Sequence, residues 1–358
     1  MQNRKKMMAH QKARSNNLSL LISFFISAAV LVGGIVLIDD FDGQRALSRL
    51  LWPLTRLILF ISIGLIAGQI IEAAGWTKAL AVIARPLFRF GNLGNHCGAA
   101  FTAAFFSGVS ANAMLLDFFK EGKITRRQLF VSNFMNQLPA FFLHLPTTFF
   151  IVIPLTGWAG GLYFLLTFCA VVLRTAILTF YGHFRLPKKA IAPQAETNNT
   201  IEKQSQSPKD IYHNIEKKFP LRIKKIIIYV VPIYVLIFVL NDMGLFKMLR
   251  QWLSEYFVTT FIPMEALLLV VLSFTAEFTS GFAAAGALLQ AGVLTIKQTV
   301  LALLIGNIIA FPIRALRHQL PRYIGIFSPK MGLQLLLMGQ GFRVVSIILV
   351  GIVYYYVG

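Results

Sequence analysis

Apolar stretches recur along this chain, most of them close to the length that an α-helix needs to cross a bilayer. They are 18–38, 50–74, 128–155, 160–181, 225–240, 296–313 and 331–356. A crossing takes about 20 residues of helix, and backbone that faces lipid must satisfy its hydrogen bonds within the helix. Because 56% of the residues are apolar, the sequence predicts an all-α polytopic membrane protein, with the lipid bilayer around it.

The formal net charge is +20. The lysine and arginine residues gather at the ends of the apolar stretches and in polar segments, which is the positive-inside pattern and no sign of nucleic-acid binding. The basic segment 1–16 places the N-terminus in the cytoplasm, and the alternation of crossings then places the C-terminus outside. The predicted location is the inner (plasma) membrane of a bacterial cell.

The stretch 105–139 interrupts this apolar pattern. Two apolar arms, each too short to cross a bilayer, meet at Ser107, Gly108, Ser110 and Asn112. Backbone that leaves the helix at membrane depth persists only where protein buries it or water reaches it. The pattern therefore predicts a re-entrant hairpin over 93–119, with its tip near mid-membrane. The exposed helix ends would bind a ligand, or the small residues serve close packing.

The next span is unusually polar, because it carries Asn133, Asn136, Gln137 and Pro139 within seven residues. Side-chain amides both donate and accept hydrogen bonds, which suits a neutral polar ligand or a sodium ion. In the other interpretation, they satisfy backbone groups that Pro139 frees. The sequence leaves both open.

The second half of the chain repeats this order. Arms at 263–274 and 281–293 flank a second tip, and the span after it is again polar. The tip contains Glu277, Thr279, Ser280 and Gly281, and the span contains Asn307 and Pro312. Aligning Ser107 with Ser280 also aligns Pro139 with Pro312. An odd number of crossings separates equivalent elements, so the halves should face opposite ways, which is a layout of secondary transporters.

Three charged residues lie deep in the predicted membrane region. Glu277 should be paired, protonated or ion-binding, because an acid at that depth is costly. Arg174 and Arg343 occupy similar places in the two halves. Each would bind an anionic group of a solute bidentately, pair with Glu277, or join the two halves. Neither a metal site nor a cofactor is expected, and the coupling ion, if any, is a proton or sodium.

These features divide the chain into five parts. They are a basic N-terminus (1–16), an extra transmembrane helix (17–40), a first repeat (50–181), a flexible cytoplasmic linker (182–222) and an inverted second repeat (223–358). The expected fold is thus an inverted repeat of about seven transmembrane helices and two re-entrant hairpins. Segments 76–90 and 245–257 are predicted to lie in the interface as amphipathic helices.

The order of span, interfacial helix, hairpin and Asn/Pro span resembles the Gate, or nucleoside-recognition, domain family. The resemblance depends on the Ser-Gly tips and the Asn/Pro spans and covers about 50–181 and 223–358. That family includes membrane parts of concentrative nucleoside transporters and ferrous-iron transporters, and the spore maturation proteins A and B. The resemblance implies transport, with a nucleoside-like solute as the first expectation. The ferrous-iron branch implies a GTPase domain, for which this sequence shows no phosphate-binding glycine motif.

The expected function is therefore the movement of a small polar solute across the membrane by alternating access. No enzymatic activity is expected, because no catalytic constellation stands out. The alternatives are a non-transporting membrane partner protein of the spore-maturation type and an ion channel. Assembly as a homo-oligomer or with a membrane partner protein stays open.

Overall fold

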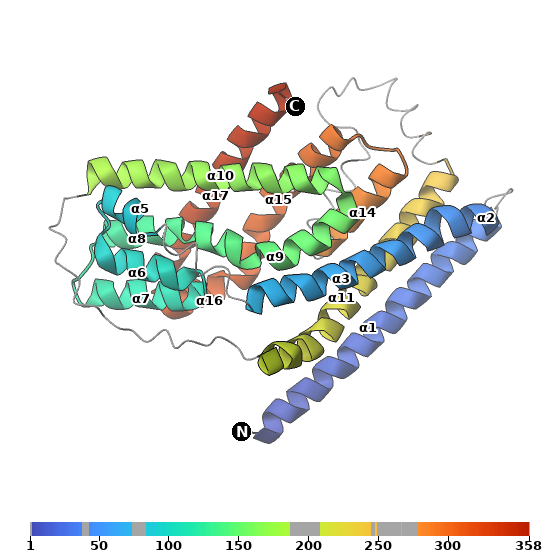
Figure 1. Cartoon of the computed structure of the whole chain (residues 1–358), viewed down its shortest axis with the longest axis horizontal. Helices are drawn as coiled ribbons and strands as arrows, with labels where there is room; N and C mark the ends of the chain where they lie inside the picture. The colour runs from blue at the N-terminus through green and yellow to red at the C-terminus, as the bar shows by residue number, and fades with distance from the viewer. Residues whose placement is uncertain are drawn as a thin grey trace. The chain divides into compact units, whose positions relative to one another are not determined.

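The computed structural model describes residues 2–37, 43–73, 84–186, 208–244 and 278–357, with positions 248 and 266. All regular structure in these segments is helical (Figure 1). Five helical segments are long and apolar enough to cross a membrane: Leu18–Val36, Arg126–Thr156, Trp158–Arg185, Ile296–Leu316 and Pro329–Val357. The remaining two predicted crossings are helical, but their apolar segments, Trp52–Ile63 and Ile226–Asp242, are shorter. An all-α membrane protein is thereby confirmed.

The first half of the chain contains α1 (Gln2–Leu37), α2 (Gly43–Ala46), the π-helical turn η1 (Leu47–Leu51), α3 (Trp52–Ala73), α5 (Ala84–Phe90), α6 (Gly94–Ala104), α7 (Gly108–Lys120), α8 (Arg126–Met135), α9 (Gln137–Thr156) and α10 (Trp158–Arg185). The second half contains α11 (Pro208–Asp242), α14 (Phe278–Gln290), α15 (Ile296–His318), α16 (Leu320–Ile326) and α17 (Pro329–Val357).

Some predicted boundaries shift in the structure. Helix α11 begins at Pro208, inside the segment predicted as linker, so the helix starts well before the apolar run. Of the first predicted interfacial helix, α5 covers 84–90. The second, 245–257, lies outside the described residues apart from Met248.

The chain folds into two compact units that exchange segments. Unit 1 comprises Met1–Ala67, Phe150–Leu162 and His213–Asn307, and unit 2 comprises Gly68–Phe149, Tyr163–Tyr212 and Ile308–Gly358. Each unit contains parts of both predicted repeats. Contacts in space define a compact unit, so a repeat in the sequence need not coincide with one unit. The inverted repeat stays a prediction.

Unit 1 is held together by close helix contacts at small residues. The Ser23 hydroxyl on α1 donates to the Ile228 carbonyl on α11 at 2.9 Å. A Cβ at Gly286 of α14 would overlap the Leu155 carbonyl and lie 2.8 Å from the Tyr234 hydroxyl. Such contacts are typical of membrane helices, which approach closely where residues are small.

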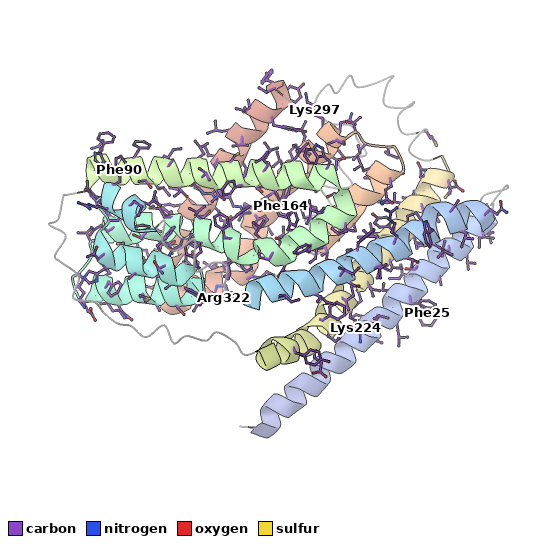
Figure 2. The ribbon with its side chains drawn as sticks, in the orientation of Figure 1. Phe25, Phe90, Phe164, Lys224, Lys297 and Arg322 are labelled. Carbon is purple, nitrogen blue, oxygen red and sulfur yellow. The ribbon has the colours of Figure 1, made fainter. Side chains whose placement is uncertain are left out.

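Unit 2 has a continuous apolar core under the hairpin of α6 and α7. Phe88 and Phe101 pack at 4.8 Å between ring centroids, beside the fully buried Leu115 and Leu129. Phe90 stacks on His183 at 4.4 Å and so joins α5 to the end of α10 (Figure 2). The core thus ties the hairpin to the long helix α10.

Helix α17 meets its neighbours in unit 2 at two glycines. A Cβ at Gly332 would lie 2.8 Å from the backbone of Tyr323 on α16, and one at Gly339 would lie 3.3 Å from the Gln137 amide nitrogen of α9. Both glycines are buried. They let two neighbouring elements approach the backbone of α17 on the face that also carries its polar side chains.

Candidate functional site

The first hairpin tip adopts the conformation that the Ser-Gly sequence predicts. Helix α6 stops at Ala104, and Ser107 caps α7 in an extended conformation by accepting from the Ser110 backbone N–H at 3.2 Å. Gly108 and Ser110 are exposed. A Cβ at Gly108 would meet nothing within 4 Å, so this glycine is not required for close packing, which was one of the two predicted roles.

Behind the tip, three polar side chains from three helices form a buried chain. The Asn133 amide on α8 donates to the Asn112 oxygen on α7 at 2.7 Å. The Tyr323 hydroxyl on α16 lies 3.5 Å from the Asn133 oxygen. Asn112 and Asn133 are 8% and 4% exposed. These two predicted site residues therefore satisfy each other, and they connect the hairpin to the second half of the chain.

The polar span itself is broken at Asn136. Helix α8 ends at Met135 and α9 begins at Gln137, within a candidate span of 31 residues. Pro139 falls in the first turn of α9, where its missing N–H costs least. The Asn136 side chain is 8% exposed, and neither of its polar atoms has a hydrogen-bond partner among the described residues. It does not satisfy backbone that Pro139 frees, which was the second predicted role.

A buried amide without a partner is costly, by about 1–3 kcal/mol on protein mutational scales. Three further oxygens in unit 2 share this condition within the described part of the chain: Oγ of Ser132, Oε1 of Gln137 and Oε1 of Gln340. Gln137 donates from its nitrogen to the Gly339 carbonyl at 3.3 Å, which brings the break in the span against α17. Hydrogen-bond acceptors on α9 and α17 thus lie near one another without donors.

The two predicted arginines meet in unit 2. Arg174 of α10, 5% exposed, donates to the Ser346 hydroxyl of α17 at 2.7 Å. The Ser346 hydroxyl donates in turn to the Arg343 carbonyl at 2.9 Å. The positive charges of Arg174 and Arg343 are close enough to repel each other. An arginine at the centre of a membrane helix costs about 2.5–3.5 kcal/mol on insertion scales.

A third arginine joins this pair. The guanidinium carbon of Arg343 lies 3.4 Å from the centroid of the Phe311 ring, and that of Arg314 lies 4.7 Å from the same centroid. Arg314 is close enough to Arg343 for their charges to interact. Arg314 directly follows the predicted span 296–313, and its contact with Phe311 was not predicted. The Arg-x-x-Phe separation of 311 and 314, one helical turn, was the available signal.

The second tip lies in unit 1 and is described only in part. Thr279, Ser280 and Gly281 are buried at the start of α14, and Asn307 is buried on α15. Ser280 and Asn307 both have interaction partners. Glu277 lies outside the described residues, so its predicted pairing or ion-binding role stays a prediction.

The helix–turn–helix units that follow the two tips are alike in detail. Helices α7 and α14 are each 13 residues long, and each is followed by a left-handed glycine, Gly122 at φ 70° and Gly292 at φ 67°. Thr125 and Thr295 then cap α8 and α15, each accepting from the backbone N–H of a glutamine three residues on at 3.3 Å. By this count Ser280 corresponds to Ser110, and Glu277 to Ser107, which differs from the alignment on Ser-Gly.

No group of three His, Cys, Asp or Glu side chains gathers as a metal site would need, among the residues that the structure describes. The polar side chains that meet at the break and around Arg174 in unit 2 carry amides, hydroxyls and guanidinium groups. Such groups bind polar or anionic solutes by hydrogen bonds.

Comparison with known proteins finds relatives in an archaeon. "Uncharacterized protein MJ1556" of Methanocaldococcus jannaschii is 27% identical over 299 residues, which is 80% of this chain and 90% of the relative. "Uncharacterized protein MJ0880" of the same organism is 28% identical over 289 residues, 79% of this chain and 91% of the relative. "Uncharacterized protein MJ0871" is 23% identical over 270 residues.

These similarities extend over more residues than either predicted repeat contains, so they involve both halves of the chain. No profile of a known protein family matches, and no solved structure does. The relatives are archaeal, so the bacterial location stays a prediction. Membership of the Gate domain family likewise stays a prediction based on the residues quoted above.

Proposed function

We propose that this protein moves a small polar solute across the membrane by alternating access, as a secondary transporter does. The observation that carries the proposal is the break at Asn136, where a buried amide lies in a membrane span without a hydrogen-bond partner among the described residues. A folded protein keeps such a group at a cost. A solute that hydrogen-bonds to the amide would offset this cost.

The position of the break also supports the proposal. Asn136 follows the exposed Arg127 by nine residues, which is about 14 Å of helix. If Arg127 marks the membrane interface, Asn136 lies near the middle of a hydrocarbon core of about 30 Å. Broken helices at the midplane are where secondary transporters bind solutes and coupling ions. Helices α6 and α7, of 11 and 13 residues, are each too short to cross, as a re-entrant hairpin requires.

The finer features follow from the sequence. The two halves form an inverted repeat, the N-terminus is cytoplasmic and the membrane is the plasma membrane. The solute is nucleoside-like by the resemblance to Gate domains, and Glu277 is the candidate carboxylate for coupling to protons or sodium. Asn112 and Asn133 hold the hairpin in place behind the solute.

Two measurements test the proposal together. Purified full-length protein is screened by thermal unfolding against nucleosides, other small polar solutes and sodium, and any solute that stabilises it is then offered to proteoliposomes as a labelled compound. The variant Asn136→Leu removes the unpartnered amide at similar volume, and Gln290→Leu, at the exposed end of α14, is the control. We expect stabilisation and uptake in wild type and Gln290→Leu, and neither in Asn136→Leu.

Three results would contradict the proposal. Equal uptake by Asn136→Leu would place the solute elsewhere. Current that grows with voltage at rates beyond any carrier cycle would identify a channel. No stabilisation across the panel, with no flux, would favour a membrane partner protein that buries its polar residues in an assembly.

A further inference from the structure

Three amide oxygens without a hydrogen-bond donor lie around the contact between α9 and α17 in unit 2. They are Oδ1 of Asn136, Oε1 of Gln137 and Oε1 of Gln340, each buried without a partner among the described residues. Asn136 and Gln137 were predicted site residues, whereas Gln340 on α17 was not. A buried acceptor that has lost its water costs free energy unless a donor replaces that water.

The side chain of Gln137 ties these oxygens to one place. Its amide nitrogen donates to the Gly339 carbonyl at 3.3 Å, and Gln340 is the next residue on α17. Because a carbonyl only accepts, the nitrogen of Gln137 must face Gly339, and its oxygen must face elsewhere. The ring of Phe134 on α8 packs against Phe342 at 5.5 Å between centroids. The acceptors thus belong to one contact between the broken span and α17.

Acceptors outnumber donors among these groups. Asn136 has both its oxygen and its nitrogen without a partner in the described part of the chain, while Gln137 and Gln340 each add one oxygen. Ser132, one turn before Asn136, can donate as well as accept, so its hydroxyl leaves the excess unchanged. A ligand that satisfied this set would bring one donor for each amide oxygen and one acceptor for the Asn136 nitrogen.

The same groups suit a ligand without a formal charge. Amide oxygens carry only partial charges, so they bind N–H and O–H dipoles but do not neutralise a cation that has left water. The acidic side chains that the structure describes in unit 2 are Asp117 and Glu121, and both are exposed. A neutral solute that is rich in hydroxyl or N–H donors therefore fits this set best.

We propose that Asn136, Gln137 and Gln340 form an acceptor-lined site that binds a neutral solute through at least three of its O–H or N–H donors. The inference rests on the proposed function, because it names the chemical class of the transported solute. Gln340 is the added binding residue, and it extends the site from the broken span to α17. Sugars and polyols have this chemistry, whereas the same molecules with methylated hydroxyl groups have lost their donors.

The test compares matched solutes on the purified full-length protein in nanodiscs. Thermal unfolding is followed with inositol, glucose and adenosine, and with the O-methylated derivative of each, which lacks the hydroxyl donors. Glucosamine and adenosine monophosphate are the positively and negatively charged counterparts, and sodium chloride is titrated alone. The variant Gln340→Met removes the acceptor at similar volume. Gln290→Met, exposed at the end of α14, is the matched control.

We expect saturable stabilisation of wild type and Gln290→Met by at least one of the three neutral solutes, and none by its methylated or charged counterpart. The affinity should fall about fivefold in Gln340→Met, because one hydrogen bond is lost. Gln340→Asn keeps the amide on a shorter side chain and should bind in between. Without solute, Gln340→Met should unfold at a higher temperature than wild type, because a buried acceptor without a donor is removed.

Several results would overturn the proposal. Equal stabilisation by a solute and its methylated derivative would do so, as would equal affinity in Gln340→Met and wild type, or no response to any of the three neutral solutes. A lower unfolding temperature of Gln340→Met without solute would show that the oxygen has a structural partner. If sodium alone stabilises wild type but not Gln340→Met, the site binds a cation, and the assignment to a neutral solute is wrong.

Flux in proteoliposomes separates this inference from the proposed function. Binding of a neutral solute that needs Gln340 but leads to no uptake would refute transport and leave the acceptor-lined site standing. Uptake that is lost in Asn136→Leu, unchanged in Gln340→Met and equal for a solute and its methylated derivative would refute the acceptor-lined site and leave transport standing.

Discussion

Replacing Asn136 and Asn133 by leucine should move the stability of the protein in opposite directions. Both asparagines are buried on consecutive turns of the same broken span, at 8% and 4% exposure. Asn136 has no hydrogen-bond partner among the described residues, so Asn136→Leu removes a desolvated amide and should raise the free energy of unfolding by about 1 kcal/mol or more. Leucine has a similar volume, which keeps the packing cost small.

Asn133→Leu instead breaks the 2.7 Å bond to Asn112 and leaves a buried oxygen unsatisfied. The free energy of unfolding should fall by about 1–3 kcal/mol. This exceeds the average of about 0.6 kcal/mol for a membrane hydrogen bond, because the Asn112 oxygen would stay buried without its donor. Equilibrium unfolding in mixed micelles, followed by tryptophan fluorescence, measures both variants. If Asn136→Leu loses as much stability as Asn133→Leu, then Asn136 has a structural partner, and the reasoning behind the candidate site is refuted.

Other predictions follow from packing, capping and titration. Gly332→Ala places a Cβ 2.8 Å from the Tyr323 backbone, whereas a Cβ at Gly341 would have nothing within 4 Å. Gly332→Ala should therefore be less stable than Gly341→Ala by about 1–3 kcal/mol. Thermal unfolding compares the two variants. Thr125→Val removes the cap of α8 and should cost about 1 kcal/mol in the same assay, and an unchanged midpoint would contradict this. Burial raises the pKa of Tyr323, so the unfolded chain ionises first, near pH 10. Stability should therefore fall above that pH, and fall less in Tyr323→Phe.

The elements that follow local rules could be predicted from the sequence. Apolar length alone marked the helical spans, and the Ser107-Gly108 dipeptide marked the break between α6 and α7, because a serine in an extended conformation caps the next helix. Asn133, Asn136 and Gln137 were chosen because amides are unexpected in an apolar span. These inferences needed only the chemistry of neighbouring residues.

What the sequence could not give depends on contacts between distant residues. Neither Tyr323 nor Arg314 was a predicted site residue, yet Tyr323 reaches Asn133 and Arg314 reaches the ring that Arg343 covers. The alignment of the halves on Ser-Gly also differs from the match of their turns. Gly122 and Gly292 must adopt a left-handed conformation at the end of a helix, which fixes their correspondence, whereas a Ser-Gly dipeptide recurs for many reasons.

The two glycine contacts of α17 restrict the motions that unit 2 can make. Gly332 and Gly339 are seven residues apart, so both lie on one face of the helix, about 10 Å from each other along its axis. Turning α17 about that axis would drive side chains with a Cβ into the backbone of Tyr323 and the amide of Gln137. Rotation of α17 relative to α16 and α9 is therefore sterically blocked at these two glycines. A conformational cycle that keeps these contacts would move α17, α16 and the start of α9 together, with any hinge outside them.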